Sequence, residues 1–256
     1  MRLFLLLLAC GAPWLIGWAQ VVLPEPPDTT DFQSWTSLKA DWKPASAWSL
    51  ELEQQIRIRE DLGSFDRHFQ QLSVGWSPQW GTVAETQQIV LGTRLLHRLD
   101  DSGNKQGWEQ YFRWHLDHVT KVKLGRWSLA SRIRYQKRSA LRLAGGDDPA
   151  SEEEKTAWRL KAVVSHNIKK WKLDPRASLE RFIAPVPEGW PSDGAWRARF
   201  GTDFKPGKRQ RLKVVLQREW QGKYLPSGTG ATLDDFRLYG NDEWALVVGW
   251  RYRFKS

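Results

Sequence analysis

The segment WALVVGWRYRF, residues 244–254, decides the fold of this 256-residue chain. From Trp244 to Phe254 every second residue is apolar, and the residues between them end in arginines. Successive side chains of a β-strand point to opposite faces, so this period of two predicts a strand with one apolar and one polar face. Its length suits the roughly 9–11 residues with which a tilted strand crosses a bilayer, and its aromatic end is typical of an interfacial girdle. We therefore expect a transmembrane strand.

The same alternation recurs along the chain. Further segments with this pattern begin near Trp48, His68, Ile89, Trp108, Trp127, Trp158, Leu173, Trp196 and Leu212. Arginines and apolar residues alternate too strictly for the 3.6-residue period of a helix. Short connections, as at 125–126, alternate with long polar ones, as at 139–154, which is typical of bacterial outer-membrane barrels.

The fold class predicted from these strands is all-β, an antiparallel up-and-down transmembrane β-barrel of about 10–12 strands. A segment at 36–42 supplies an eleventh strand, and one at 236–239 is a candidate for a twelfth. Bacterial single-chain barrels normally have an even number of strands, so the count stays open at this point.

The amino-terminus has the pattern of a secretion signal. A short basic start and an apolar run precede Gly17-Trp18-Ala19, which places small residues at a cleavage site. The domain organisation we expect is a signal peptide at 1–19, a proline-containing periplasmic leader at 20–34 and an outer-membrane barrel at 35–256. The only cysteine, Cys10, lies in the signal, so the mature chain has no disulfide or thiolate metal site.

Several short motifs resemble one family in their order along the chain. They are WTSL (35–38), LELEQQIR (50–57), RIRYQ (132–136), DPRASLE (174–180) and WRYRF (250–254). Together they resemble the predicted outer-membrane barrels catalogued as domain of unknown function 2490, a family common in Bacteroidota. The resemblance implies a barrel in the outer membrane of a Gram-negative cell. It implies no activity and no catalytic residues.

If the apolar face meets lipid, the opposite face lines the lumen, because arginines in hydrocarbon would each cost about 2–4 kcal/mol near the midplane. The residues predicted to line the lumen are Glu51, Glu53, Arg57, Arg59, Arg94, Glu109, Arg113, Asp117, Arg132, Arg134, Arg159, Glu180, Arg197, Arg199, Arg251 and Arg253. Two interpretations compete: a structural network that closes the lumen, or a narrow porin-like passage for small anionic solutes. The chain's net charge of +10 is compatible with both.

The other classes of function have weaker support. We expect no enzyme and no cofactor or metal site, although His115 and Asp117 share the inward face and could act in an outer-membrane lipid-modifying enzyme. Basic residues spread over every strand and do not form one patch, so no nucleic-acid partner is expected. A soluble periplasmic β-barrel binding module is the remaining alternative. The expected partners are outer-membrane lipid and the barrel-assembly machinery. The carboxy-terminal strand resembles the signal that this machinery recognises in outer-membrane barrels.

Overall fold

The computed structural model describes residues 30–78, 86–100, 106–149, 154–183, 195–226 and 236–254, and for 221–242 the backbone alone. These residues form one all-β unit. Its strands are β1 (Thr30–Ala45), β2 (Trp48–Arg59), β3 (Ser64–Trp76), β4 (Thr86–Asp100), β5 (Gly107–Leu124), β6 (Trp127–Arg142), β7 (Lys155–His166), β8 (Leu173–Ile183), β9 (Ala195–Gly207), β10 (Gln210–Pro226) and β11 (Phe236–Arg253). A short 3₁₀ turn, Ala144–Gly146, follows β6. Within the described residues, no helix is long and apolar enough to cross a membrane.

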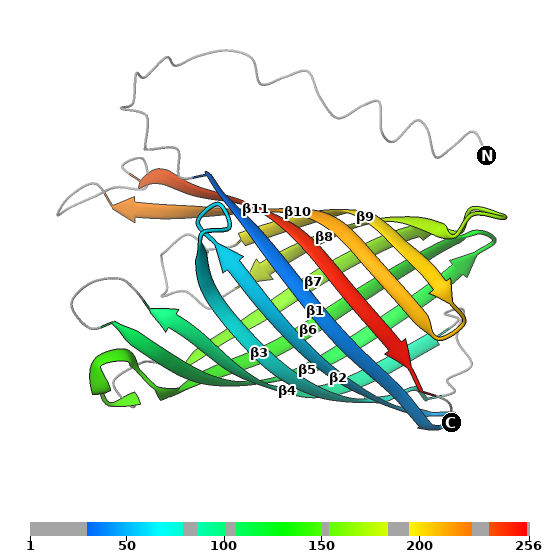
Figure 1. Ribbon diagram of the computed structural model, residues 1–256, viewed down its shortest axis with the longest axis horizontal. Helices are drawn as coiled ribbons and strands as arrows, with labels where there is room; N and C mark the ends of the chain where they lie inside the picture. Colours follow the sequence, from blue (N-terminus) through cyan, green and yellow to red (C-terminus); the bar gives the residue numbers. More distant parts are fainter. Residues whose placement is uncertain are drawn as a thin grey trace, which may run out of the picture.

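The eleven strands close into a barrel in which each strand pairs with its neighbours in the sequence (Figure 1). All pairs are antiparallel except the closing one, in which β1 runs parallel to β11 with Phe32 opposite Trp244 and Asp41 opposite Arg253. An up-and-down barrel with an odd number of strands must close with a parallel pair, because its first and last strands run in the same direction. The barrel is thus confirmed, with strand 36–42 as part of it and a purely antiparallel closure replaced by a parallel one.

The two ends of the barrel carry different connections. At the end where β11 finishes, the strands are joined by residues 46–47, 77–85, 125–126, 167–172 and 208–209. At the opposite end they are joined by residues 60–63, 101–106, 143–154, 184–194 and 227–235, and β1 begins there. We call these the short-turn end and the long-loop end. The carboxy-terminus therefore lies at the short-turn end, across the barrel from the start of β1 (Figure 1).

Two boundaries differ from the sequence prediction. β1 begins at Thr30, inside the segment expected as a leader, because its pairing with β11 extends back to Asp242. Residues 236–239 are the start of β11 and not a separate strand. The pairing of β10 with β11 runs without a break from Gln210 opposite Tyr252 to Pro226 opposite Phe236. The expected signal peptide at 1–19 and the leader up to residue 29 lie outside the described residues.

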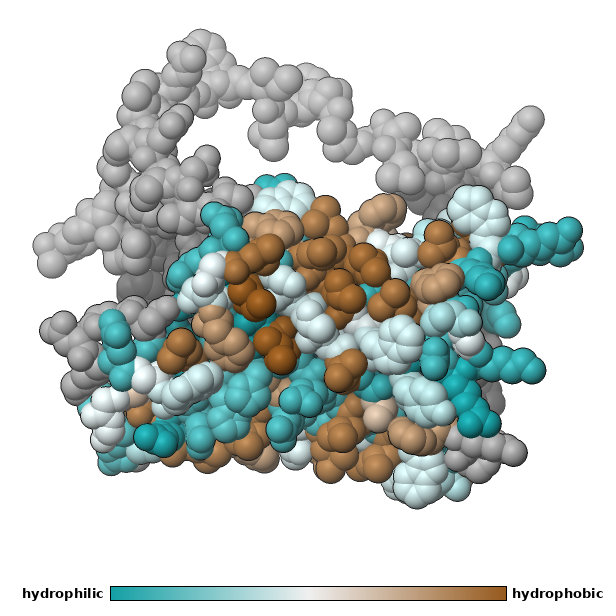
Figure 2. All heavy atoms as spheres, in the orientation of Figure 1, coloured by the Kyte–Doolittle hydropathy of each residue, from teal (hydrophilic) through white to brown (hydrophobic). Residues whose placement is uncertain are grey.

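The outer face of the barrel carries the apolar side chains. Large hydrophobic residues exposed there include Leu38, Leu52, Ile56, Leu91, Leu116, Leu129, Ile133, Leu160, Leu179, Phe200, Val214 and Leu216. Figure 2 shows hydrophobic residues gathered over the middle of the visible face, with polar ones among them and toward both ends. Each of these strands therefore exposes large apolar side chains on its outer face. A soluble barrel would bury side chains of this kind.

Aromatic rings flank this apolar region near both ends. Toward the long-loop end, Trp114, Tyr135 and Trp158 stand side by side on three strands, with ring centroids 5.4 and 5.1 Å apart. Near the short-turn end, the centroids of Trp127 and His166 are 4.3 Å apart. Rings at both borders of an apolar band are typical of the interface girdles of membrane barrels.

Candidate functional site: the charged lumen

The barrel encloses a cavity of about 710 Å³ whose wall is mostly charged. Its lining includes Asp31 and Arg59 near the long-loop end and Arg211 and Arg251 near the short-turn end. The cavity therefore runs along most of the length of the barrel. This is the candidate site, because inward side chains of all eleven strands surround it.

The structure places the predicted lumen residues as follows. The cavity lining contains Glu51, Glu53, Arg57, Arg59, Arg94, Arg113, Arg132, Arg134, Arg159, Arg197, Arg199 and Arg251. Glu109, Asp117 and Glu180 are buried within the wall and are not part of that lining. Arg253 is exposed at the end of β11 and does not line the cavity.

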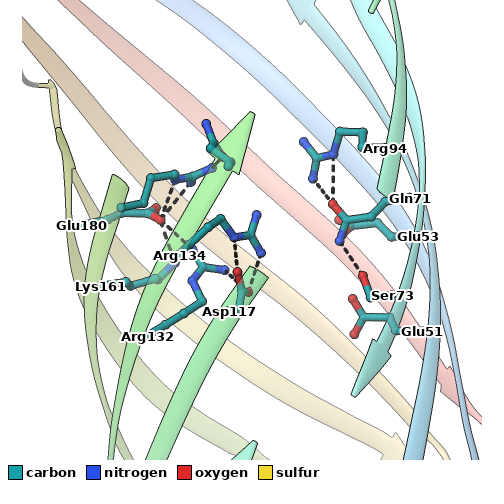
Figure 3. A network of polar contacts seen from close by, with 12 residues as sticks. Glu51, Glu53, Gln71, Ser73, Arg94, Asp117, Arg132, Arg134, Lys161 and Glu180 are labelled. Carbon is teal, nitrogen blue, oxygen red and sulfur yellow. Dashed lines mark hydrogen bonds and ion pairs between the residues drawn. The ribbon is translucent and has the colours of Figure 1, made fainter. Parts of the chain in front are cut away.

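Glu180 on β8 is the centre of one group of ion pairs (Figure 3). Its side chain is only 1% exposed. Arg132 and Arg159 each place Nη2 near its Oε1, at 2.6 and 2.8 Å. Arg197 and Lys161 approach Oε2 at 3.6 and 3.8 Å. One buried carboxylate thus faces four cations from three neighbouring strands, which ties β6, β7 and β9 to β8.

Asp117 on β5 belongs to the same side of the lumen. Arg134 donates from Nε and Nη2 to its two carboxylate oxygens, at 2.6 and 2.7 Å. This is the bidentate arrangement that makes arginine–carboxylate pairs strong. His115, the candidate partner of Asp117, is fully buried, and its ring nitrogens have no hydrogen-bond partner among the described residues. The structure does not bring His115 and Asp117 together as a hydrogen-bonded dyad.

A second group of ion pairs lies where the barrel closes. Lys39 on β1 donates to Glu51 and Glu53 on β2, at 3.0 and 2.7 Å. Arg251 on β11 donates from Nη2 to the other oxygen of Glu51 at 2.7 Å. Residues 200 positions apart in the chain are thereby joined, and the pair fixes β11 and β2 on either side of β1.

A third group of arginines is held by uncharged partners. Arg94 donates from Nε and Nη2 to Oε1 of Gln71, at 2.9 and 2.5 Å, and Gln71 in turn donates to Ser73 at 3.1 Å (Figure 3).

Two other arginines have the same kind of partner. Arg57 donates to Gln55 at 2.9 Å and Arg199 to Gln217 at 2.7 Å. An amide oxygen orients a guanidinium group without cancelling its charge. The hydrogen-bond partner of each of these three arginines is thus a neutral amide.

Inward aromatic rings separate the guanidinium groups. Arg94 lies 3.4 Å from the centroid of Phe69, and Arg57 lies 3.7 Å from that of Trp35. Trp35 also faces Arg197, at 5.3 Å.

Beyond Trp35 the contacts continue to the far wall. Phe182 lies between Arg197 and Arg159, at 4.6 and 4.4 Å. Guanidinium groups over aromatic faces are attracted by the ring quadrupole, by about 0.5–2 kcal/mol each. The rings therefore help to hold like charges close together, and they narrow the lumen.

The charges of the lumen do not balance. Seventeen lysines and arginines line the cavity, but only seven aspartates and glutamates do. Four more acids pair with lining arginines: Asp41, Glu60, Asp117 and Glu180. They raise the acids to eleven and leave a surplus of six positive charges among the described residues. Burying a charge without a partner is costly, so this surplus favours anions in the lumen.

Sequence reasoning missed some of these residues. Trp35, Phe69 and Phe182 point inward, although apolar residues were expected on the outer face. Lys39 was also missed, although it lies with Ser37 and Asp41 on the face of the first strand opposite the apolar one. A usable signal existed for Trp35, since it lies out of phase with the apolar residues Leu38, Ala40 and Trp42 on the same strand.

The groups that line the cavity are suited to contact with anions. Among the described residues, no group of three or more histidine, aspartate, glutamate or cysteine side chains is placed to hold a metal ion. What the wall offers is guanidinium and ammonium groups that are fixed in position by carboxylates, amides and rings.

Fold and lumen together define a closed β-barrel with an apolar outer face and a positively charged interior. The family described as Protein of unknown function (DUF2490) matches residues 32–232, and the chain belongs to this family. No match was found among curated proteins or among solved structures.

Proposed function

We propose that this chain is an outer-membrane β-barrel whose lumen forms a narrow passage that prefers small anions. The outer-membrane location is supported by the exposed apolar belt, by the aromatic rings at both of its borders and by the secretion-signal pattern at 1–19. The closed ladder supports it too, since a barrel leaves no unpaired edge in hydrocarbon.

The observation that carries the anion preference is the set of arginines paired with glutamines. A lumen built only as a structural network would pair its arginines with carboxylates, as Arg134 is paired with Asp117. Arg57, Arg94 and Arg199 instead have amide partners, which leave their charge available to a solute. Rings of charged side chains set the selectivity of pores.

The structural network is part of the same proposal. The pairs around Glu180 and Asp117 fix one wall, and the pairs around Lys39 fix the closing seam. These pairs make the lumen rigid and narrow, while the arginines held by amides determine which sign of ion it prefers. Lipid around the belt and the barrel-assembly machinery, acting on β11, are the partners expected for such a protein.

The test is the reversal potential of the refolded protein in a planar bilayer under a KCl gradient. We expect the sign that indicates chloride over potassium. The triple variant R57Q/R94Q/R199Q should move the permeability ratio toward unity. The control K43Q/R126Q/K169Q removes the same charge from exposed residues at the short-turn end and should leave the ratio nearly unchanged. A clear preference for potassium in the unmodified protein would contradict the proposal.

A further inference from the structure

One arginine in the lumen has an unused binding edge. The Nε and Nη2 atoms of Arg113 are both buried and have no hydrogen-bond partner among the described residues. Arg113 is also one of the residues that line the cavity, so a turn of its side chain would bring this edge to the space that a solute would enter. Arg134 uses the same two atoms to bind both oxygens of Asp117, at 2.6 and 2.7 Å.

The neighbours of Arg113 increase the positive charge at this point. Arg94 on β4 is directly opposite Arg113 on β5, and Arg138 on β6 is opposite it on the other side. Like charges directly opposite one another in a sheet destabilise the pairing. An anion between them would remove this repulsion. Arg94 is already oriented by Gln71 and Phe69, so it needs no rearrangement to take part.

The next inward residue of β5 has the same property. His115 is fully buried, and both of its ring nitrogens are without a partner among the described residues. Its ring lies over Gly92, where a Cβ atom would come within 2.2 Å of Cε1. A glycine at this position therefore makes room for the polar ring, two residues along β5 from Arg113.

We propose that Arg113, with Arg94 opposite, forms an oxyanion site that binds a carboxylate or phosphate group of a small solute. This inference rests on the proposed function and names the solute class of the passage. Nε and Nη2 of an arginine match two oxygens of a carboxylate or phosphate in a planar, bidentate contact. Water could accept the same hydrogen bonds, but it would leave the buried charge uncompensated. Chloride would compensate the charge, but it offers one acceptor atom where a carboxylate or phosphate offers two.

The experiment is isothermal titration calorimetry of the refolded chain with inorganic phosphate and, separately, with acetate, both in a chloride background. Wild-type protein should bind at least one of the two. Binding of phosphate alone or of acetate alone supports the site and tells which group the solute carries. Absence of binding by both would overturn the inference, since it would mean that the edge does not prefer an oxyanion to water or chloride.

Two variants test the geometry. R113Q removes the charge, and R113K keeps the charge but lacks the Nε–Nη2 edge. Because hydrogen bonds to charged groups are among the strongest in proteins, both should weaken binding by about tenfold or more. The control R211Q changes another lining arginine, whose nearest carboxylate oxygen, on Asp203, is 3.8 Å away, and should bind as the wild type does. Equal binding by R113K and wild type would overturn the site.

The outcome is separable from that of the proposed function. R113K preserves the lumen charge, so its reversal potential should equal that of the wild type even though its phosphate or acetate affinity falls. Anion preference without oxyanion binding would remove the site and leave the passage. Oxyanion binding with potassium preference would remove the passage and leave the site. Heat-dependent electrophoretic mobility confirms that each variant has folded.

Discussion

Replacing Glu180 by glutamine should destabilise the barrel more than any other single loss of a lumen carboxylate. Glutamine keeps the volume and one acceptor oxygen but removes the charge. Arg132 and Arg159 then lose a charged partner at 2.6 and 2.8 Å. Breaking a buried ion pair typically costs about 3–5 kcal/mol, and because the amide retains one hydrogen bond we expect about 3 kcal/mol for E180Q.

Arg197 and Lys161 add to this loss. They lie within 3.6 and 3.8 Å of Glu180 and would then face a neutral group in a wall that already has surplus positive charge. The repulsion among four cations is the reason for placing the expected cost well above that of one neutral hydrogen bond, which is about 1 kcal/mol.

The assay is equilibrium unfolding of the refolded barrel by urea in lipid vesicles, followed by tryptophan fluorescence. The matched control is E219Q, because the Glu219 side chain is 21% exposed and forms its ion pair with Arg197, at 2.5 Å. It should cost clearly less, about 1 kcal/mol. Equal midpoints for wild type and E180Q, or a larger loss in E219Q, would refute the view that Glu180 holds this wall together.

Three further predictions follow from particular contacts. G92A should lower the free energy of unfolding by about 1–3 kcal/mol, because its Cβ would meet the ring of His115. The double variant G92A/H115A should lose less stability than the two single losses added together. A loss in the double variant equal to that sum would argue against this contact. W35L should lower the free energy of urea unfolding by about 1–3 kcal/mol, since it removes the ring under Arg57 and the hydrogen bond from Nε1 to Gln33. W35F keeps a ring and should keep most of the stability. Similar losses in both variants would argue against the guanidinium–ring contact. In intact cells, D147C should react with an impermeant maleimide and S46C should not, because the two residues lie at opposite ends of the barrel; the reverse pattern would mean that the barrel sits the other way round.

The alternation of apolar and charged residues was enough to predict the barrel and most of its inward face. It works for residues such as Arg57 and Arg132 because a side chain's direction in a strand depends only on its position in the sequence. The prediction failed to include the inward rings of Trp35 and Phe69, since hydrophobicity alone does not separate a ring that faces lipid from one that stacks on a guanidinium group.

Partners and closure needed the three-dimensional structure. Glu51 and Arg251 meet only because the barrel closes, and no local pattern indicates a contact between residues 200 positions apart. The parallel β1–β11 pair likewise depends on the parity of the strand count, which one uncertain strand at either end can change. The count left open at 10–12 strands is eleven among the described residues.

The central claim is that the apolar face of each strand meets lipid while the charged face lines the lumen. Spin labels placed singly at residues 244–254 of β11, in protein refolded into bilayers, test it most directly through their accessibility to oxygen and to a water-soluble nickel reagent. We predict that oxygen accessibility peaks at Trp244, Leu246, Val248 and Trp250 and dips at the residues between them. Preferential access of the nickel reagent to those same four positions, or the absence of any alternation, would contradict the account.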